Sequence, residues 1–341
     1  MKNFIYNIPK AELHIHIEGS LEPELMFDRA KKNNIKIPFT SINQLHTAYK
    51  FSNLQSFLDV YYEGLRVLVN EEDFYDLTWN YLKKIFLQNV RHAEIFFDPQ
   101  AHTSRGIPFK TVITGIHKAL VDGQKHFNLS SRLIMCFLRD FDIDNCFEIL
   151  EQAIPFKDRI VGVGLDSTEV GNPPEKFTLL FQRAIKEGFK TVAHAGEEGS
   201  PEYIWQAIEK LHVSRIDHGV RCMEDEALVE TLINRQIPLT VCPLSNIKLK
   251  IFNSMEEHNL KLMLDSGLCV TVNSDDPAYF GGYIAENFLA SQKALNLSRN
   301  NIYELAKNSF KAAFLNLTEK QCFLKELEDF MANNNYKCSH K

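Results

Sequence analysis

Short runs of apolar and β-branched residues recur along the chain, separated by longer stretches with helical periodicity. Several runs are almost continuously apolar, which is typical of strands that are covered on both faces. The predicted strands are 11–16, 91–97, 132–138, 160–165, 190–195, 214–219, 239–244 and 269–274. Between them, the apolar positions of 74–88 fall on one helical face: Phe74, Leu77, Tyr81, Leu82 and Ile85. Strands that alternate with helices pair in parallel, so the pattern predicts an α/β fold, a (β/α)8 TIM barrel.

One interval is too long for a single connecting helix, because about 74 residues separate the first two predicted strands. We expect 17–89 to form a helical insertion near the barrel mouth, with a helix over 21–33 that starts near Pro23. Residues 284–333 have the pattern of C-terminal helices. Because there is no internal repeat and no Pro/Gly/Ser-rich linker, the sequence predicts one barrel domain over 1–341.

Composition and charge exclude several classes of protein. The 341 residues are 45% hydrophobic and 24% charged, as in a globular protein and unlike a disordered or fibrous chain. The formal net charge of −6 disfavours binding to nucleic acid or to anionic lipid, and no run is long enough to span a membrane. Seven cysteines without Cys-x-x-Cys spacing, and an N-terminus without a secretory pattern, predict a cytoplasmic protein with neither a disulfide framework nor a thiolate zinc site.

Several of the predicted strands end in polar residues that can bind metals. His14 and His16 end the first strand, His194 lies near the end of the fifth, and Asp275 follows the eighth. The C-terminal ends of barrel strands converge, and residues i and i+2 of a strand point the same way. Three imidazoles and one carboxylate suit Zn²⁺, and the absence of Cys favours a catalytic site with an open or water-filled position.

Each of these residues also has a simpler interpretation. A His-x-His pair alone is equally compatible with two unrelated, hydrogen-bonded histidines, and an isolated Asp275-Asp276 before Pro277 would be a solvated turn. Their convergence with a third histidine favours the metal site. Adjacent carboxylates repel unless each has its own partner, so we expect Asp275 to bind the metal and Asp276 to face a donor on the substrate.

Two further residues have the chemistry of proton transfer. Glu197 lies three residues after His194, where an apolar pocket above a metal would raise its pKa and make it a general acid. His218 is a candidate to take the proton of a metal-bound water or to hold that water electrostatically, and its simpler interpretation is a neutral core histidine. Four aromatic residues of the insertion are candidates for a lid over a flat ring, although core packing is the commoner use of this spacing: Phe51, Phe57, Tyr61 and Tyr62.

With these residues identified, the sequence resembles the adenosine and adenine deaminase family of metal-dependent hydrolases. The resemblance rests on ordered motifs over nearly the whole chain: LHIHIEGSLEPE (13–24), AHAGEEG (193–199), RIDHGVRC (215–222), LTVCPLSN (239–246) and VTVNSDDPAYFGGY (270–283). Three segments are most similar to the adenine-acting branch: FSNLQSFLDVYYEG (51–64), RHAEIFFDPQ (91–100) and GVGLDSTEVGNPP (162–174).

The resemblance implies an enzyme of purine salvage that converts adenine to hypoxanthine and ammonia. One Zn²⁺ per chain would be held by His14, His16, His194 and Asp275. Hydroxide on the zinc would attack carbon 6 of the purine. The implied roles of the remaining residues are proton transfer to ring nitrogen 1 by Glu197, orientation and deprotonation of the water by His218 with Asp275, and a hydrogen bond to ring nitrogen 7 from Asp276.

Two more carboxylates are predicted to contact the substrate. Glu18 follows His16 by two residues, so on an extended chain it points to the same mouth. Adenosine-acting relatives tend to have Asp there, and the longer Glu18 would accept the N–H at ring nitrogen 9 and reject a ribose. We place Glu169 in the purine pocket as well.

Other classes of enzyme fit the sequence less well. Cytidine-deaminase-type enzymes need Pro-Cys-x-x-Cys, which is absent. Binuclear relatives carry a modified Lys at the end of strand four, where this chain has Asp166-Ser167-Thr168-Glu169. The alternatives that stay open are a deaminase of adenosine or of another 6-aminopurine, and a non-catalytic barrel that binds a ligand or a partner.

Overall fold

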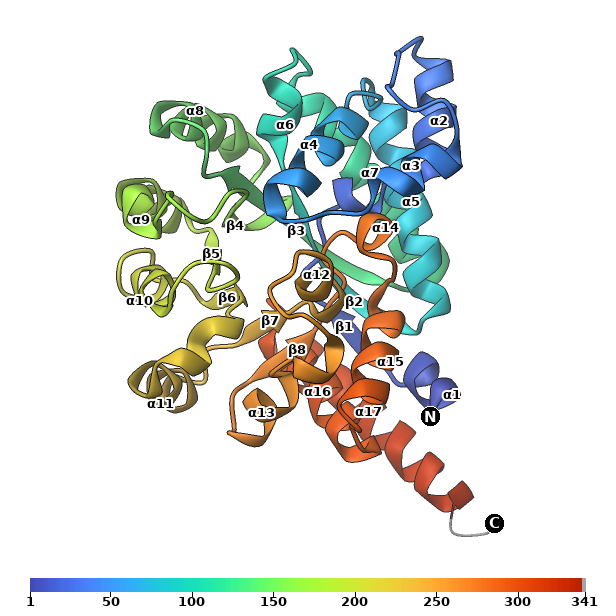
Figure 1. Ribbon diagram of the computed structural model, residues 1–341, viewed down its shortest axis with the longest axis vertical. Helices are drawn as coiled ribbons and strands as arrows, with labels where there is room; N and C mark the ends of the chain where they lie inside the picture. Colours follow the sequence, from blue (N-terminus) through green and yellow to red (C-terminus); the bar gives the residue numbers. More distant parts are fainter. Residues whose placement is uncertain (339–341) are drawn as a thin grey trace.

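Eight parallel strands form one sheet in which the spatial order, β1 to β8, is the order along the chain (Figure 1). The computed structural model describes residues 1–338. The strands are β1 Lys10–Glu12, β2 Val90–Phe97, β3 Ser130–Leu138, β4 Ile160–Asp166, β5 Lys190–Ala195, β6 Arg215–His218, β7 Leu239–Val241 and β8 Val270–Val272. With helices around this sheet, the predicted (β/α)8 barrel is confirmed. The predicted domain also includes 339–341, which lie outside the described residues.

The first strand is shorter than predicted, because it ends at Glu12 and not at residue 16. Beyond it, the backbone closes the barrel against the loop that follows β8. The Asp275 N–H donates to the carbonyl of His14 at 3.0 Å, and the His16 N–H donates to the carbonyl of Asp275 at 3.1 Å. Three metal-ligand candidates, His14 and His16 near one end of the chain and Asp275 toward the other, are thus joined through their backbones.

Side chains continue the closure between β1 and β8 below this point. The Glu12 carboxylate accepts the Ser274 N–H at 3.1 Å and its hydroxyl at 2.7 Å, and the Leu13 N–H donates to Oδ1 of Asn273 at 3.0 Å. These buried polar groups satisfy backbone donors that a longer ladder would have paired.

The predicted helical insertion lies between β1 and β2. It contains η1 Glu18–Ser20, α2 Pro23–Lys32, α3 Ile42–Ala48, α4 Leu54–Leu65 and α5 Glu71–Leu87. Asn53 and Asn70 cap α4 and α5 through their side-chain oxygens, and Pro23 occupies the first turn of α2 as expected. The predicted apolar face of α5 is buried from Phe74 to Ile85.

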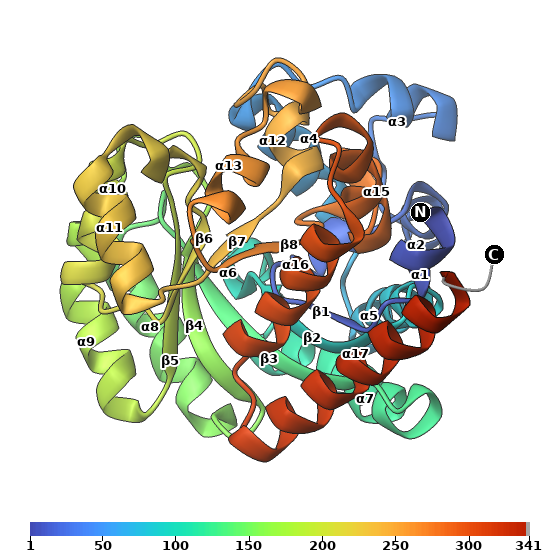
Figure 2. The ribbon, with the colours of Figure 1, turned by 90° about the horizontal axis from the view of Figure 1, so that it is seen from below.

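The remaining α-helices lie around the barrel, and the last of them crosses its N-terminal end. They are α1 Lys2–Asn7, α6 Pro99–Thr103, α7 Phe109–Phe127, α8 Ile143–Ala153, α9 Thr178–Glu187, α10 Pro201–Glu209, α11 Glu226–Arg235, α12 Pro243–Lys248, α13 Leu260–Asp265, α14 Pro277–Phe280, α15 Ile284–Ala294, α16 Arg299–Ala312 and α17 Leu317–Cys338. Ion pairs from Glu326 to Arg91 at 2.7 Å and from Glu319 to Arg132 at 3.1 Å hold α17 across the starts of β2 and β3 (Figure 2). The opposite end of the barrel is left for the site.

A buried ion pair crosses the barrel interior. Arg215 of β6 donates to Oε2 of Glu94 of β2 at 2.6 Å, and neither residue is exposed to solvent. Burial alone would raise the pKa of Glu94, but the Arg215 guanidinium and His92 lower it to about 2. The Glu94 carboxylate is therefore charged at neutral pH.

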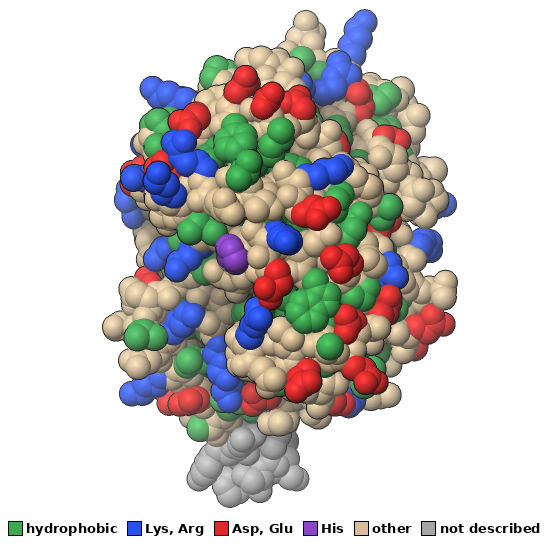
Figure 3. All heavy atoms as spheres, turned by 90° about the vertical axis from the view of Figure 1, so that its left-hand side faces the viewer, with side chains coloured by type: hydrophobic (Ala, Val, Ile, Leu, Met, Phe, Trp, Pro, Cys, Tyr) green, Lys and Arg blue, Asp and Glu red, His purple; other side chains and the backbone are tan. Residues whose placement is uncertain are grey.

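The outer surface is mixed in charge. On the face in Figure 3, Lys and Arg side chains are interspersed with Asp and Glu, so this face has no extended basic track of the kind that binds a phosphate backbone. Among the helices of the described residues, none is both long enough and apolar enough to cross a membrane.

Candidate active site

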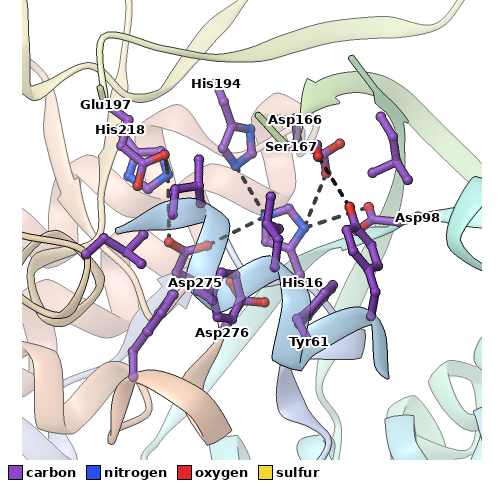
Figure 4. Close-up of a pocket in the computed structure, with 17 residues that line it drawn as sticks. His16, Tyr61, Asp98, Asp166, Ser167, His194, Glu197, His218, Asp275 and Asp276 are labelled. Atoms are coloured by element: carbon purple, nitrogen blue, oxygen red, sulfur yellow. Dashed lines mark hydrogen bonds and ion pairs between the residues drawn. The ribbon is translucent and has the colours of Figure 1, made fainter. Parts of the chain in front are cut away.

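A cavity opens at the C-terminal ends of the strands, under α4 of the insertion. It is lined by His16, Leu54, Phe57, Leu58, Tyr61, Tyr62, Asp98, Leu138, Asp166, Ser167, His194, Glu197, His218, Leu249, Asp275, Asp276 and Phe280. Figure 4 shows the polar members of this set converging from several strand ends. The residues predicted from strands one, five, six and eight therefore meet, as the barrel topology requires.

Three histidines and Asp275 bring ligand atoms together at the centre of this cluster. The Nε2 atoms of His16 and His194 lie 3.2 Å apart, and Oδ1 of Asp275 lies 3.3 Å from Nε2 of His14 and 3.6 Å from Nε2 of His16. Ligands held tetrahedrally about 2.0–2.1 Å from a zinc ion are separated by roughly 3.3 Å. The buried Nε2 atom of His14 has no hydrogen-bond partner among the described residues. The spacing and this unpartnered atom fit a metal ion.

The surroundings of His14 and His16 aim Nε2 at the cluster. Thr240 donates its hydroxyl hydrogen to Oδ1 of Asp217 at 2.8 Å, so its oxygen accepts the Nδ1–H of His14 at 2.9 Å. Nδ1 of His16 faces Oδ2 of Asp166 at 3.4 Å. With a hydrogen on Nδ1, each ring presents the Nε2 lone pair to a metal. A metal-binding histidine usually donates its other ring N–H to a neighbouring acceptor in this way.

His194 completes the histidine set from β5. Its Nδ1 atom lies 3.8 Å from Oδ2 of Asp217, and its backbone carbonyl accepts an N–H of the buried Arg139 at 2.8 Å. Burial, followed by the neighbouring histidines, lowers the pKa of His194 well below its ordinary value. The ring is therefore neutral at pH 7, as a metal ligand must be.

His218 lies beside the cluster with the opposite tautomer. The Leu260 N–H donates to Nδ1 of His258 at 3.0 Å, so His258 carries its hydrogen on Nε2 and donates to Oδ1 of Asn246 at 3.1 Å. The amide nitrogen of Asn246 then faces Nδ1 of His218 at 3.4 Å. Burial and the nearby imidazoles, against the effect of Asp275, lower the pKa of His218 to about 3. A neutral His218 accepts at Nδ1 and therefore presents an N–H at Nε2.

This tautomer separates His218 from the metal-binding set. A nitrogen from each of His14, His194 and His218 and an oxygen of Asp275 lie within 4.8 Å of one another, so distance alone would admit His218 as a ligand. Its Nε2–H, which lies 3.7 Å from Oδ2 of Asp275, makes it a donor instead. Of the two roles left open for His218, this geometry favours electrostatic support of a water molecule over acceptance of its proton.

Glu197 has the environment of a general acid. Its Oε2 atom lies 3.6 Å from Nε2 of His218, and its Oε1 atom is buried without a hydrogen-bond partner among the described residues. Burial first, and then the neighbouring Asp275 and Glu169, raise the pKa of Glu197 well above its ordinary value. A carboxyl group that keeps its proton at neutral pH can deliver it to a substrate.

Glu169 lies behind the loop that carries Glu197 and does not line the cavity. Its carboxylate accepts four consecutive backbone N–H groups: those of Gly196 at 2.6 Å, Glu197 at 3.2 Å, Glu198 at 2.7 Å and Gly199 at 2.7 Å. The predicted position in the purine pocket is therefore corrected. Because the Glu169 carboxylate binds these backbone groups, Glu169 acts on Glu197 by holding its loop in position.

Glu18 is also absent from the cavity lining. Its side chain is fully buried, where Oε1 accepts the backbone N–H of Asp98 at 3.2 Å and the Nε2–H of His102 at 2.9 Å. Burial, and then Asp98, raise the pKa of Glu18 to about 8. The rule that residues i and i+2 share a face does not apply, because residues 18–20 form a 3₁₀ turn and not a strand. The predicted direct contact with the substrate is not compatible with this burial.

Asp276 faces the cavity as predicted, with an Oδ1 atom that has no hydrogen-bond partner among the described residues. Burial first, and then Asp275, raise the pKa of Asp276 well above its ordinary value. A protonated carboxyl group at this position can donate to a lone pair of a ligand.

The aromatic residues of α4 form the roof of the cavity. Phe57, Tyr61 and Tyr62 line it, and the Tyr62 hydroxyl lies 3.3 Å from Oγ of Ser167. Phe51 lies outside the lining and packs edge-on against Phe57 with ring centroids 5.3 Å apart. Three of the four predicted residues are thus above the site, and whether α4 moves as a lid stays a prediction.

Four polar residues of the site were not predicted to act in it: Asp98, Asp166, Ser167 and Asn246. Asp98 and Asp166 carry the same signal that identified the histidines, since each is a polar residue where an apolar strand ends. Asn246 lies in the LTVCPLSN motif, but nothing in the sequence indicates that it would contact His218.

Comparisons with known proteins agree with this architecture. The family model described as adenosine deaminase matches residues 9–330. Proteins named adenine deaminase from Crocosphaera subtropica and Chlorobium phaeobacteroides are both 60% identical to this chain, over 94% and 98% of it and over 98% and 99% of their own lengths.

Solved structures of similar proteins have the same fold over nearly the whole chain. The crystal structure of an adenine deaminase from Arthrobacter aurescens is 48% identical, with a TM-score of 0.94 over 95% of this chain and 99% of its own. An amidohydrolase from Burkholderia ambifaria with bound Zn is 25% identical, with a TM-score of 0.90 over 97% of this chain and 94% of its own. With matches that span nearly its whole length, the chain belongs to the adenosine deaminase family.

Proposed function

We propose that the protein is an adenine deaminase, which hydrolyses adenine to hypoxanthine and ammonia in purine salvage. The observation that carries the proposal is the pairing of Glu197, a buried acid with a raised pKa, with the N–H of His218 beside three histidines and Asp275. The names of the relatives at 60% identity support adenine as the substrate.

The proposal includes one Zn²⁺ per chain, held by His14, His16, His194 and Asp275. The unpartnered Nε2 atom of His14 and the ligand spacing support this set. Nitrogen and oxygen ligands without Cys are typical of catalytic zinc, and the structural relative from Burkholderia ambifaria has bound Zn. A bound zinc ion supplies a nucleophile at neutral pH by lowering the pKa of a water molecule from 15.7 to roughly 7.

Four residues of the chain have separate roles in the reaction. Glu197 delivers its proton to ring nitrogen 1, which makes carbon 6 more electrophilic. His218 donates its Nε2–H to the attacking water, and Oδ2 of Asp275, 3.7 Å from that nitrogen, accepts the proton that the water loses. Asp276 donates to ring nitrogen 7. Once water has added to carbon 6, the amino group takes the proton held by Asp275 and leaves as ammonia. The hydroxyl group on carbon 6 returns a proton to Glu197, and hypoxanthine with a hydrogen on ring nitrogen 1 remains.

The surroundings of the site suit a flat apolar ring. Phe57, Tyr61 and Tyr62 cover the cavity from α4, and Phe280 and Leu249 complete its apolar wall. Exclusion of water by this roof strengthens every electrostatic contact inside the cavity. We propose further that the chain acts as one barrel domain in the cytoplasm, which is supported by the buried free thiols of Cys136, Cys146 and Cys242.

The test is turnover by the purified holoenzyme. We expect ammonia release and an ultraviolet change with adenine, and a kcat/KM for adenosine that is lower by orders of magnitude. Equal or faster turnover of adenosine would identify an adenosine deaminase instead. Absence of turnover with every 6-aminopurine, in protein that contains metal, would leave a non-catalytic barrel.

A further inference from the structure

A pair of carboxyl side chains lines the cavity without contacting the reacting atoms in the reaction described above. Asp98 directly follows β2 and Asp166 is the last residue of β4. Both are buried, with 3% and 2% of their surface exposed, and both border the cavity. One oxygen of each and a ring nitrogen of His16 lie within 4.8 Å of one another.

The oxygens of this pair are short of donors. Oδ1 of Asp98 and both Oδ atoms of Asp166 are buried and have no hydrogen-bond partner among the described residues. Nδ1 of His16 lies 3.4 Å from Oδ2 of Asp166 and 3.8 Å from Oδ1 of Asp98, and the buried thiol of Cys136 beside Asp166 is a weak donor, so neither carboxyl group has a strong partner. Buried acceptors without partners are costly, so this pair is prepared for a donor that a ligand brings.

The pair lies at the end of the cavity away from the proton-transfer residues. In Figure 4, Glu197 and His218 lie on one side of His16, and Asp98 and Asp166 lie on the other. A purine whose nitrogen 1 and carbon 6 face Glu197 and His218 directs its opposite edge, with nitrogens 3 and 9, toward the two aspartates. Nitrogen 9 of free adenine carries the only ring N–H of the molecule, and a nucleoside has a sugar in its place.

Resting on the proposed function, we propose that Asp98 and Asp166 accept the N–H at ring nitrogen 9 and thereby select the free base over its N9-substituted forms. A site built around one substrate N–H rejects an analogue without it, because its buried acceptors are then left unpaired. The Tyr62 hydroxyl and Oγ of Ser167, which lie 3.3 Å apart, line the cavity next to Asp166.

This assignment also gives Glu18 a defined part. Oε1 of Glu18 accepts the backbone N–H of Asp98 at 3.2 Å and is itself held by the Nε2–H of His102 at 2.9 Å. Glu18 is therefore a positioning residue that fixes where Asp98 stands. The sequence predicted that Glu18 itself would accept the N–H at ring nitrogen 9. In this assignment Asp98, which Glu18 holds in place, accepts it instead.

The experiment compares adenine with 9-methyladenine, which keeps the reacting edge, adds a single methyl group and lacks the N–H. For wild-type holoenzyme we expect kcat/KM to favour adenine by at least about 10²-fold. In Asp98→Ala and in Asp166→Ala we expect this ratio to fall at least about tenfold, mainly through a higher KM for adenine. The matched control is Asp140→Ala, which removes an exposed carboxylate just after β3 and should leave the ratio unchanged.

The ratio separates selection from a merely structural effect. A variant that loses metal or folds poorly loses both activities by the same factor, so an unchanged ratio in both variants would overturn the proposal. It would also be overturned if elemental analysis of the wild type gave a second metal equivalent that is lost in the variants, since the pair would then bind a cation. If no 6-aminopurine is turned over, calorimetric binding of adenine and 9-methyladenine gives the same ratio, so the proposed activity and the proposed selection fail independently.

Discussion

Gly19 lies so close to Asp276 that a Cβ atom at residue 19 would stand 1.9 Å from the Oδ1 atom and 2.6 Å from the Cα atom of Asp276. No rotation of the Asp276 side chain removes the second contact, because it involves the backbone. The turn after His16 therefore needs glycine in order for Asp276 to reach the cavity.

We expect Gly19→Ala to lower kcat/KM for adenine by at least about 10²-fold, since one misplaced group near the chemistry has an effect of this size. Overpacking should also lower the free energy of unfolding by about 1–3 kcal/mol. Steady-state kinetics and urea unfolding measure the two effects. Gly267→Ala is the control, because it adds only backbone strain at a φ of +89° in open space and should lower stability alone. Equal kinetics for the two variants would contradict this assignment.

Glu169 holds the loop of Glu197 through four backbone N–H groups. In Glu169→Gln one oxygen becomes an NH₂ group that faces donors, so the loop must shift. We expect kcat to fall about 10- to 100-fold while zinc content is retained and KM changes little. Glu175→Gln, at an exposed position in the following turn, is the matched control. A rise in KM with an unchanged kcat would instead return Glu169 to the purine pocket.

The acid role of Glu197 is tested by an isosteric change. Glu197→Gln keeps the shape of the side chain and removes its proton, so we expect zinc to stay bound and kcat to fall by about 10²–10⁴-fold. Elemental analysis and single-turnover rates provide the measurement. Glu198→Gln changes the neighbouring carboxyl group, which does not line the cavity, and should stay within a few-fold of wild type. The role is refuted if the two variants have similar rates.

We expect His14→Ala to lose its metal and still fold. The variant removes the ligand whose Nε2 atom is buried without a partner, so we expect its zinc content to fall far below one equivalent and its activity to disappear. Its melting temperature should lie at or somewhat below that of chelated wild type, because both proteins lack the stability that a bound ligand adds by mass action and the variant also leaves a cavity beside Thr240. Full activity of wild type after exhaustive chelation, or two equivalents of bound metal, would contradict the single-zinc site.

The strands and the main cluster could be predicted from one sequence pattern and one rule of barrel topology. Apolar runs of strand length identified all eight strands, and the rule that strand ends converge brought His14, His194 and Asp275 together across the chain. Glu18 and Glu169 could not be placed in this way. Both lie where the chain has left a strand, one in a 3₁₀ turn and one in a loop that begins with Ser167 at a φ of +71°, so no periodicity fixes their direction.

The buried pair of Glu94 and Arg215 should make stability depend on pH in a defined direction. The folded pKa of Glu94, about 2, lies below its ordinary value of 4.5. The stability that this carboxylate contributes is therefore fully present above about pH 4.5 and is lost as the pH falls toward 2. This difference in the pKa of Glu94 between the folded and unfolded chains corresponds to about 3 kcal/mol of unfolding free energy. Removal of one partner of a buried ion pair lowers stability by a similar amount.

We therefore expect Glu94→Gln to lower the free energy of unfolding by about 3 kcal/mol at pH 7. The difference from wild type should shrink as the pH falls below 4.5, because the wild-type carboxylate becomes protonated while the amide does not titrate. Urea unfolding at pH 7, 5, 4 and 3, with chelator present so that metal loss is common to both proteins, measures this difference. Glu326→Gln, which removes a partly exposed partner of Arg91, should differ from wild type by no more than about 1 kcal/mol. A difference for Glu94→Gln that stays constant from pH 7 to pH 3 would mean that the pKa of Glu94 is the same in the folded and unfolded chains, and that the pair contributes through packing alone.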